Sequence, residues 1–183
     1  MDSPQKSRPQ SIYLDQVQIL GGLWHNRQAA NRDKAIPAIY QQLQETGRIA
    51  AWEMNPERKL AQKRNILHMF WDSDTAKWVE AAAYSLHTHP DAALQKQVDA
   101  VIDLMASAQE ADGYLNTYFG NLEPENKWAN LRDWHELYNA GHLIESAVAY
   151  KRATGKDKML RVLQHFADLI ATRPAEPRDS SRL

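Results

Sequence analysis

The feature that most constrains the fold of this chain is an internal repeat with an offset of 65 residues. Residues 78–106 align with residues 143–171, and Pro90 meets Gly155 at the turn inside each unit. Acidic and apolar positions match as well, in the pairs Glu80 and Glu145, Ala82 and Ala147, Leu94 and Met159, Val98 and Leu163, and Asp103 and Asp168. Each unit is expected to be a helical hairpin that cannot cover its own apolar face, so such units stack. The alternative is that any two amphipathic hairpins align at some offset.

Apolar residues recur at helical spacing in five segments, which predicts helices over 23–43, 74–88, 92–109, 134–153 and 157–172. Pro37 is expected to kink or divide the first helix, because proline has no backbone N–H to donate. The expected N-caps of the next three helices are Ser73 or Asp74, then Asp91, then Asp133.

The segments between the helices carry further expectations. Residues 11–20 partly alternate apolar and polar, which predicts a short strand or an extended arm. Residues 47–73 and 114–130 are expected to be long irregular connections, which are commonly functional. We expect residues 1–10 and 173–183 to be a disordered lead and tail.

Repeated helical hairpins form either an open solenoid or a closed α/α toroid, in which inner helices alternate with outer ones. The helices expected at 74–88 and 134–153 are rich in Ala, as closely packed inner helices should be. Those at 92–109 and 157–172 carry more Lys, Gln and Asp, as outer helices should. The residues alone therefore predict an all-α fold of stacked hairpins.

The charge balance and the absence of cysteine exclude several classes of function. Lys and Arg number 22 against 23 Asp and Glu, so no strong field favours nucleic acid or an anionic membrane.

No apolar run approaches the ~20 residues of a transmembrane helix. The polar start has no apolar core of a secretory signal, so we expect a cytoplasmic protein. With 0 Cys, the chain holds no disulfide, thiolate metal site or cysteine nucleophile.

The densest group of chemistry-bearing residues is WHELYNAGH, which begins at residue 134. His135, Asn139 and His142 share one helix face, and a neutral imidazole in the first turn can hydrogen-bond a sugar hydroxyl. The alternative is a histidine that caps the helix or is satisfied in the core. A zinc site of the H-E-x-x-H type fails because position 139 is Asn. Gly141 in mid-helix suggests that another helix approaches closely.

A second group, residues 68–74, leads into Lys77 and Trp78 and combines aromatic surface with carboxylates. It suits a polyol ligand whose ring stacks on Trp71 or Trp78 while Asp72 accepts from hydroxyls. The alternative is that the acidic residues and the serine of this segment only cap the helix.

A third group is the D-G-Y-L turn, which contains Gly113 and Tyr114. In a toroid it would lie on the same rim as the other two groups, although a purely structural turn is the alternative. His87 and His89 flank another turn, and we expect them to be solvated and to bind no metal.

The segments FWDSDTAKWVEAAAYSL, AQEADGYLNTYF and HELYNAGHLIESAVAYKRATGK resemble the N-terminal part of the β-L-arabinofuranosidase-like glycoside hydrolases, glycoside hydrolase family 127. The resemblance covers about residues 11–172. It implies an (α/α)6 toroid followed by β-sandwich domains, and a retaining hydrolase that releases β-linked L-arabinofuranose. An arabinofuranoside-type carbohydrate is therefore the expected partner, with no nucleic acid and no membrane.

In that family a cysteine is the nucleophile, held with zinc by further cysteines and a glutamate, while a second glutamate is the acid/base candidate. Those positions lie downstream of the matched segments, so the resemblance transfers no catalytic and no metal-binding residue. We expect no cofactor in this chain, and zinc only in full-length relatives. The resemblance transfers His135 as a sugar-binding residue, and Asp72, Trp78 and Tyr114 match further motif positions.

Six units would need roughly 390 residues, and about two and a half are present. We therefore expect residues 11–172 to be the N-terminal part of a toroid catalytic domain, truncated and catalytically inactive by itself. Exposed apolar sides of the terminal helices would then favour self-association. The alternatives are a helical-repeat module that binds sugar or protein without catalysis, and a family member that acts on another sugar.

Overall fold

A computed structural model describes residues 12, 16–55 and 68–173 of the chain. Its helices, in chain order, are α1 (Gly22–Ala30), a π-helix (Asn31–Ala35), α2 (Ile36–Glu45), a 3-10 helix (Ala50–Glu53), α4 (Trp71–Thr88), α5 (Ala92–Ala108), α6 (Thr117–Asn121), a 3-10 helix (Pro124–Asn126), α7 (Glu136–Thr154) and α8 (Lys158–Ala171). The described residues contain no strand, so the expected all-α class is confirmed. The described part of the expected arm, residues 12 and 16–20, likewise forms no strand. The expected lead and all of the expected tail except Arg173 lie outside these residues.

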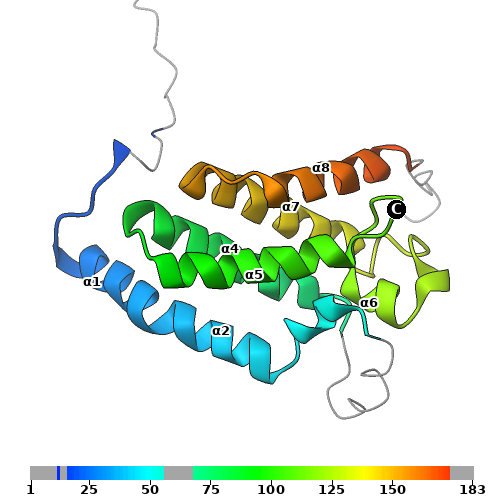
Figure 1. Ribbon diagram of the computed structural model, residues 1–183, viewed down its shortest axis with the longest axis horizontal. Coiled ribbons are helices and arrows are strands. Elements are labelled where there is room, and N and C mark those ends of the chain that lie inside the picture. Colours follow the sequence, from blue (N-terminus) through cyan, green and yellow to red (C-terminus); the bar gives the residue numbers. More distant parts are fainter. Residues whose placement is uncertain (1–11, 13–15, 56–67, 174–183) are drawn as a thin grey trace, which may run out of the picture.

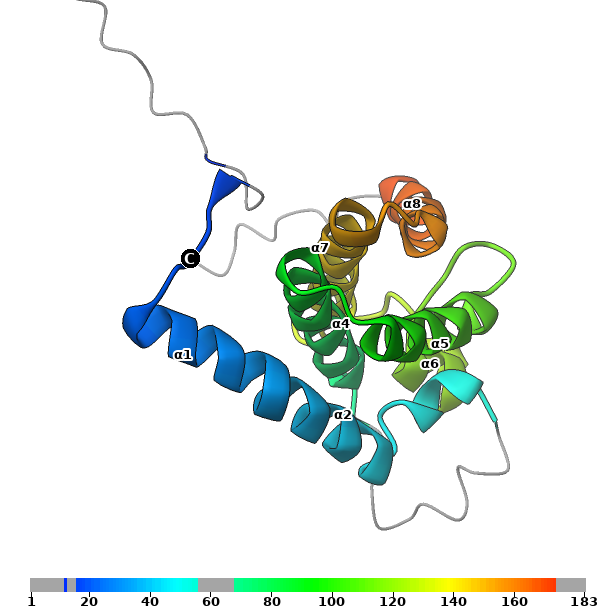
Figure 2. The ribbon, with the colours of Figure 1, turned by 60° about the vertical axis from the view of Figure 1, so that its left-hand side comes forward.

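Two helical hairpins stack side by side, as the repeat predicts. The first consists of α4 and α5, and the second of α7 and α8. Helix α4 packs against α7, and α5 packs against α8 (Figures 1 and 2). The hairpins therefore bury their apolar faces against each other, which neither could do alone.

Small side chains line the buried faces of α4 and α7. The alanines of these helices that are at most 2% exposed are Ala76, Ala82, Ala83, Ala140 and Ala147. Such residues let helix axes approach closely, as expected for inner helices. The expectation for Gly141 is wrong, however. This glycine is exposed, and a Cβ added there would meet no atom within 4 Å.

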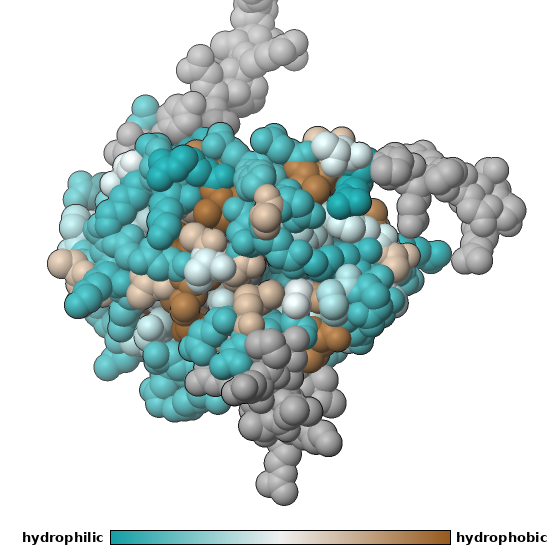
Figure 3. Space-filling model, turned by 45° about the vertical axis from the view of Figure 1, so that its right-hand side comes forward, coloured by the Kyte–Doolittle hydropathy of each residue, from teal (hydrophilic) through white to brown (hydrophobic). Residues whose placement is uncertain are grey.

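The outer helices supply larger side chains to the same core. Helix α5 buries Val98, Val101, Ile102 and Met105, and α8 buries Met159, Leu163 and Phe166. On the face shown in Figure 3, hydrophobic residues reach the surface in separate patches between hydrophilic ones. No helix in the described part of the chain is long and apolar enough to span a membrane.

The first helical segment runs without a break from α1 through the π-helix into α2. Pro37 cannot donate to the carbonyl of Asp33, and its ring would crowd that carbonyl in a regular α-helix. The turn around Asp33 is the π-helix, whose wider spacing accommodates the proline. Pro37 therefore loosens the helix locally and does not divide it. Helix α1 buries no residue and projects away from the body of the molecule (Figure 2).

Two helices begin at other residues than the expected ones. Helix α4 begins at Trp71, three residues early, because the Ser73 hydroxyl donates to the Phe70 carbonyl at 2.8 Å and so lies inside the first turn. Helix α7 begins only at Glu136, and Asp133 does not cap it. The Asp133 backbone N–H donates instead to the side-chain oxygen of Asn130 at 3.0 Å, in the turn that precedes the helix.

The cap expected at Asp91 is confirmed, since its carboxylate accepts from the backbone N–H groups of Ala93 at 2.8 Å and Leu94 at 3.1 Å. The expectation of an irregular stretch over 114–130 is wrong in part, because it contains α6 and a 3-10 helix. Asn116 starts α6 by accepting from the Phe119 backbone N–H at 3.0 Å.

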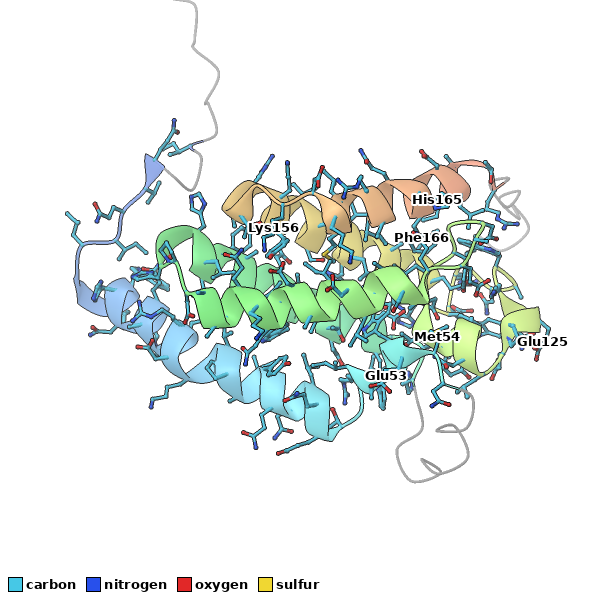
Figure 4. All side chains as sticks on the ribbon, viewed as in Figure 1. Glu53, Met54, Glu125, Lys156, His165 and Phe166 are labelled. Atoms are coloured by element: carbon cyan, nitrogen blue, oxygen red, sulfur yellow. The ribbon has the colours of Figure 1, made fainter. Side chains whose placement is uncertain are left out.

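The turn that leads into this stretch packs tightly against α8. Gly113 has a φ of +96°, and a Cβ there would lie 2.7 Å from the carbonyl oxygen of His165. His165 and Phe166 lie at the end of α8 that faces this turn (Figure 4). At this end, the loop between the hairpins meets the beginnings of α4 and α7.

Candidate functional site

A row of exposed and half-buried rings lies where α4 and α7 begin. We call it the aromatic row, and its members are His68, Phe70, His135, Tyr138 and His142. Ring centroids of successive members are 4.0, 6.0, 5.6 and 4.6 Å apart. The row joins the segment before α4 to the first two turns of α7, which are far apart in sequence.

A buried asparagine brings the two halves of the row together. Asn139 is 0% exposed, and its side-chain amide donates to the Met69 carbonyl at 2.6 Å. This bond ties α7 to the residue next to Phe70. The Phe70 ring consequently lies against His135.

His135 occupies the N-cap position of α7 with a left-handed backbone, at a φ of 59°. Its carbonyl accepts from the Asn139 backbone N–H at 2.9 Å, which starts the helix, while its side chain makes no capping bond. A left-handed residue with a Cβ costs roughly 1–2 kcal/mol. Such strain occurs often at functional sites, where the surrounding structure maintains it. The imidazole is exposed and takes no part in capping α7.

One cation, Lys77, contacts the row, and a second, Arg48, lies over the neighbouring Trp71 ring. The Lys77 ammonium donates to the Tyr138 hydroxyl at 2.8 Å, and this bond lowers the pKa of Tyr138. Arg48 pairs with Asp74 at 2.7 Å, and its guanidinium lies 4.5 Å from the ring centroid of Trp71. The row therefore carries one ammonium group at Tyr138, whereas the charge of Arg48 is balanced by Asp74.

The Asp72 carboxylate lies beneath the surface and is 2% exposed. It accepts from the backbone N–H of Thr117 at 2.9 Å and from the hydroxyl of the same residue at 2.5 Å. Burial raises the pKa of Asp72 to about 6, although both hydrogen bonds favour the charged form. Asp72 therefore ties α4 to α6 and turns its oxygens toward its own chain.

Tyr114 is also buried, at 1% exposed, and its hydroxyl donates to the Glu136 carboxylate at 2.6 Å. The same carboxylate accepts from the backbone N–H of Trp128 at 3.0 Å. Burial raises the pKa of Glu136 and of Tyr114. Glu136 is not among the residues predicted from the sequence. The sequence signal that could have identified this residue is its position directly after His135, in the first turn of an expected inner helix.

Trp78 is the third buried member of the predicted set, at 2% exposed. Its indole N–H donates to the Ile36 carbonyl at 3.0 Å, and its ring lies 4.8 Å from that of Tyr40. It forms part of the wall of a groove of about 460 Å³ between α2 and α4, which is also lined by Arg48, Asp74 and Lys77.

Of the four predicted substrate-binding residues, the structure exposes only His135. The polar atoms of Asp72, Trp78 and Tyr114 already have partners in this chain. The structure therefore does not expose the four on one surface, and their roles in binding stay predictions.

The described residues do not offer ligands for the zinc ion that the resemblance implies in full-length relatives. The sequence has 0 Cys, and the described residues contain no group of three His, Asp or Glu side chains that could hold a metal ion. His87 and His89 are half-buried at the end of α4, where the His89 ring lies 3.0 Å from the Thr88 hydroxyl.

The family model of the β-L-arabinofuranosidase GH127 catalytic domain matches residues 16–182. The chain belongs to this family. A curated relative, the non-reducing end β-L-arabinofuranosidase of Bifidobacterium longum subsp. longum, is 42% identical over 106 residues, which are 56% of this chain and 16% of the relative.

Two solved structures of GH127 enzymes align with the fold. The GH127 β-L-arabinofuranosidase Ara127N-Se from Geobacillus stearothermophilus T6 gives a TM-score of 0.74 at 40% identity, over 85% of this chain and 25% of that one. The GH127 β-arabinofuranosidase BT3674 gives a TM-score of 0.77 at 33% identity, over 90% of this chain and 27% of that one. The GH127 chain thus forms part of a toroid domain and spans about a quarter of these enzymes.

Proposed function

We propose that this chain is the part of a GH127 catalytic domain that recognises the arabinofuranose ring, and that the groups that break the glycosidic bond lie outside it. The observation that carries the proposal is the exposed His135 imidazole, held between aromatic rings where the two inner helices begin.

The chemistry of the aromatic row suits a sugar. An imidazole nitrogen can donate to a hydroxyl or accept from one, and the neighbouring rings offer apolar surface to sugar C–H groups. Lys77 and the Tyr138 hydroxyl add polar groups at the edge of the row. The relatives that share this part of the fold are β-arabinofuranosidases, which supports a furanose as the ligand.

Binding tests this proposal directly. L-arabinose is titrated into the purified chain and its His135→Ala variant by calorimetry, with His25→Ala as a histidine control on the distant helix α1. We expect His135→Ala to weaken binding about fivefold, the equivalent of one neutral hydrogen bond of about 1 kcal/mol, and His25→Ala to bind like wild type. Equal affinity of all three proteins would overturn the proposal.

The absence of catalysis is a separate part of the proposal. The two carboxylates of the described residues that are buried and have a raised pKa are Asp72 and Glu136, and both already accept hydrogen bonds from this chain. Neither is presented to a scissile bond, and no cysteine is available as a nucleophile. We expect no release of nitrophenol from 4-nitrophenyl β-L-arabinofuranoside by the pure chain. Turnover above the buffer rate would show that this part is wrong.

A helical-repeat binding module for another protein is the second candidate, because α1 buries no residue and exposes Leu23 and Trp24. Binding to L-arabinose that depends on His135 would favour the sugar site. A chain that binds no sugar at all would leave the module as the better explanation.

A further inference from the structure

Tyr138 lies between two histidines and is not fixed there by burial. Its ring centroid is 5.6 Å from that of His135, at an interplanar angle of 89°, and 4.6 Å from that of His142, at 83°. The side chain is 45% exposed. A tyrosine this exposed is free to rotate unless a polar contact holds its hydroxyl.

Lys77 supplies that contact from the neighbouring inner helix. Its ammonium donates to the Tyr138 hydroxyl at 2.8 Å and lies 5.1 Å from the centroid of the ring. Its second hydrogen-bond partner, the Ser73 hydroxyl, is 3.4 Å away. The ammonium therefore lies closer to Tyr138 than to the serine of its own helix.

The His135 ring has no hydrogen bond of its own to set its orientation in the described structure. Its side chain does not cap α7, and its backbone is left-handed. The ring of Phe70, in the turn before α4, at 6.0 Å and 65°, and the ring of Tyr138, on α7, flank it. The direction of the imidazole thus depends on these two neighbours.

We infer that Lys77 and Tyr138 are positioning residues, which hold the His135 imidazole in the orientation that binds the sugar. Lys77 fixes the Tyr138 hydroxyl, and the Tyr138 ring then limits the rotation of His135. The inference rests on the proposed function, because it assigns a purpose to this orientation. It also explains why an exposed lysine of α4 reaches across to α7.

The test measures the orientation of the ring apart from sugar binding. The imidazole carbon–proton signals of His135 are assigned by NMR from their loss in His135→Ala, in the full chain without ligand. We expect ring currents from Phe70 and Tyr138 to displace these signals from the free-histidine position. Tyr138→Leu and Lys77→Met should move them back toward that position, whereas Lys77→Arg should retain the displacement.

Two further variants separate a positioning role from a structural one. Tyr138→Phe keeps the ring and removes the hydroxyl, so it should mimic Lys77→Met. Lys96→Met, which removes an exposed lysine from outer helix α5, should leave the His135 signals in place. Lys77→Met should also raise the pKa of Tyr138, which is followed through its ring carbon signals. Lys77 and Tyr138 are exposed, so these variants should keep the wild-type circular dichroism.

The same variants are then titrated with L-arabinose. We expect Lys77→Met and Tyr138→Phe to bind about threefold more weakly, and Lys77→Arg to bind like wild type. His135 signals that do not move in Lys77→Met and Tyr138→Leu would overturn the inference, as would wild-type affinity of Lys77→Met when His135→Ala binds more weakly than wild type. If His135→Ala binds like wild type, the proposed function fails, while the displaced signals still report whether the pair orients the ring.

Discussion

Replacing the buried Asp72 by asparagine should remove one specific pH dependence of stability. Burial raises the pKa of Asp72 from its ordinary value of 3.8 to about 6 in the folded chain. Well below the unfolded pKa of 3.8, the group is protonated in the folded and unfolded states, and its contribution to stability is fully present. As the pH rises through the folded pKa, the Asp72 carboxyl ionises. The unfolded chain accommodates this negative charge at lower free energy than the buried site does, so the free energy of unfolding falls. At about 1.4 kcal/mol per pKa unit, the full loss is about 3 kcal/mol.

Asparagine fits the site without this loss. Its side-chain oxygen can accept from the Thr117 backbone N–H, as one carboxylate oxygen does at 2.9 Å in the wild type. Its amide can donate to the Thr117 hydroxyl, which is able to accept as well as donate. Asp72→Asn should therefore fold and keep both links between α4 and α6 at every pH.

The assay is urea unfolding followed by circular dichroism at several pH values from 3.5 to 7.5, on wild type, Asp72→Asn and Asp168→Asn. Asp168 is an exposed carboxylate of α8, so this variant controls for the loss of one surface charge. Relative to wild type, Asp72→Asn should become more stable by about 3 kcal/mol between the ends of the range. A stability difference that stays constant with pH would refute the reasoning.

Three further predictions concern the loop and the exposed helix. Tyr114→Phe leaves the buried Glu136 carboxylate with the Trp128 backbone N–H but without its hydroxyl donor, and it should lower the free energy of unfolding by about 1–3 kcal/mol, whereas equal stability in urea would contradict the buried bond. Gly113→Ala should lower the free energy of unfolding by at least about 1 kcal/mol more than Gly155→Ala. Both glycines have a positive φ, but a Cβ at Gly113 would collide with the His165 carbonyl, whereas a Cβ at Gly155 would meet no atom within 4 Å. Equal thermal shifts would contradict the close approach to α8. Trp24→Ser should reduce concentration-dependent self-association in light scattering, because Trp24 is 70% exposed. A wild-type chain that is monomeric at the same concentrations would show this expectation to be wrong.

The repeat was sufficient to predict the hairpins and their stacking, because apolar spacing and turn residues are local signals. The beginnings of α4 and α7 were not predictable in the same way. Ser73 and Asp133 are good caps by residue type, but the choice depends on contacts with distant segments. The Asn139 amide, for example, bonds to the Met69 carbonyl and fixes how the two segments meet.

Of the four predicted binding residues, only His135 lies exposed as the prediction requires, and its role in binding stays a prediction. Asp72 and Tyr114 lie in motifs that suit a ligand equally well, yet their partners Thr117 and Glu136 come from elements distant in sequence. Lys77 and Tyr138 are 61 positions apart, and no spacing rule within one helix relates them. Burial and pairing across helices are properties of the packed chain, and a one-dimensional pattern does not contain them.

The loop between α5 and α7 is fastened at two points, each by a carboxylate in the first turn of an inner helix. Asp72 accepts from the backbone N–H of Thr117, and Glu136 accepts from that of Trp128. Neither amide can reach solvent until a buried carboxylate has released it. In hydrogen–deuterium exchange, these two amide protons should therefore exchange together with the interface between α4 and α7, and the loop should open as one cooperative unit with the inner helices.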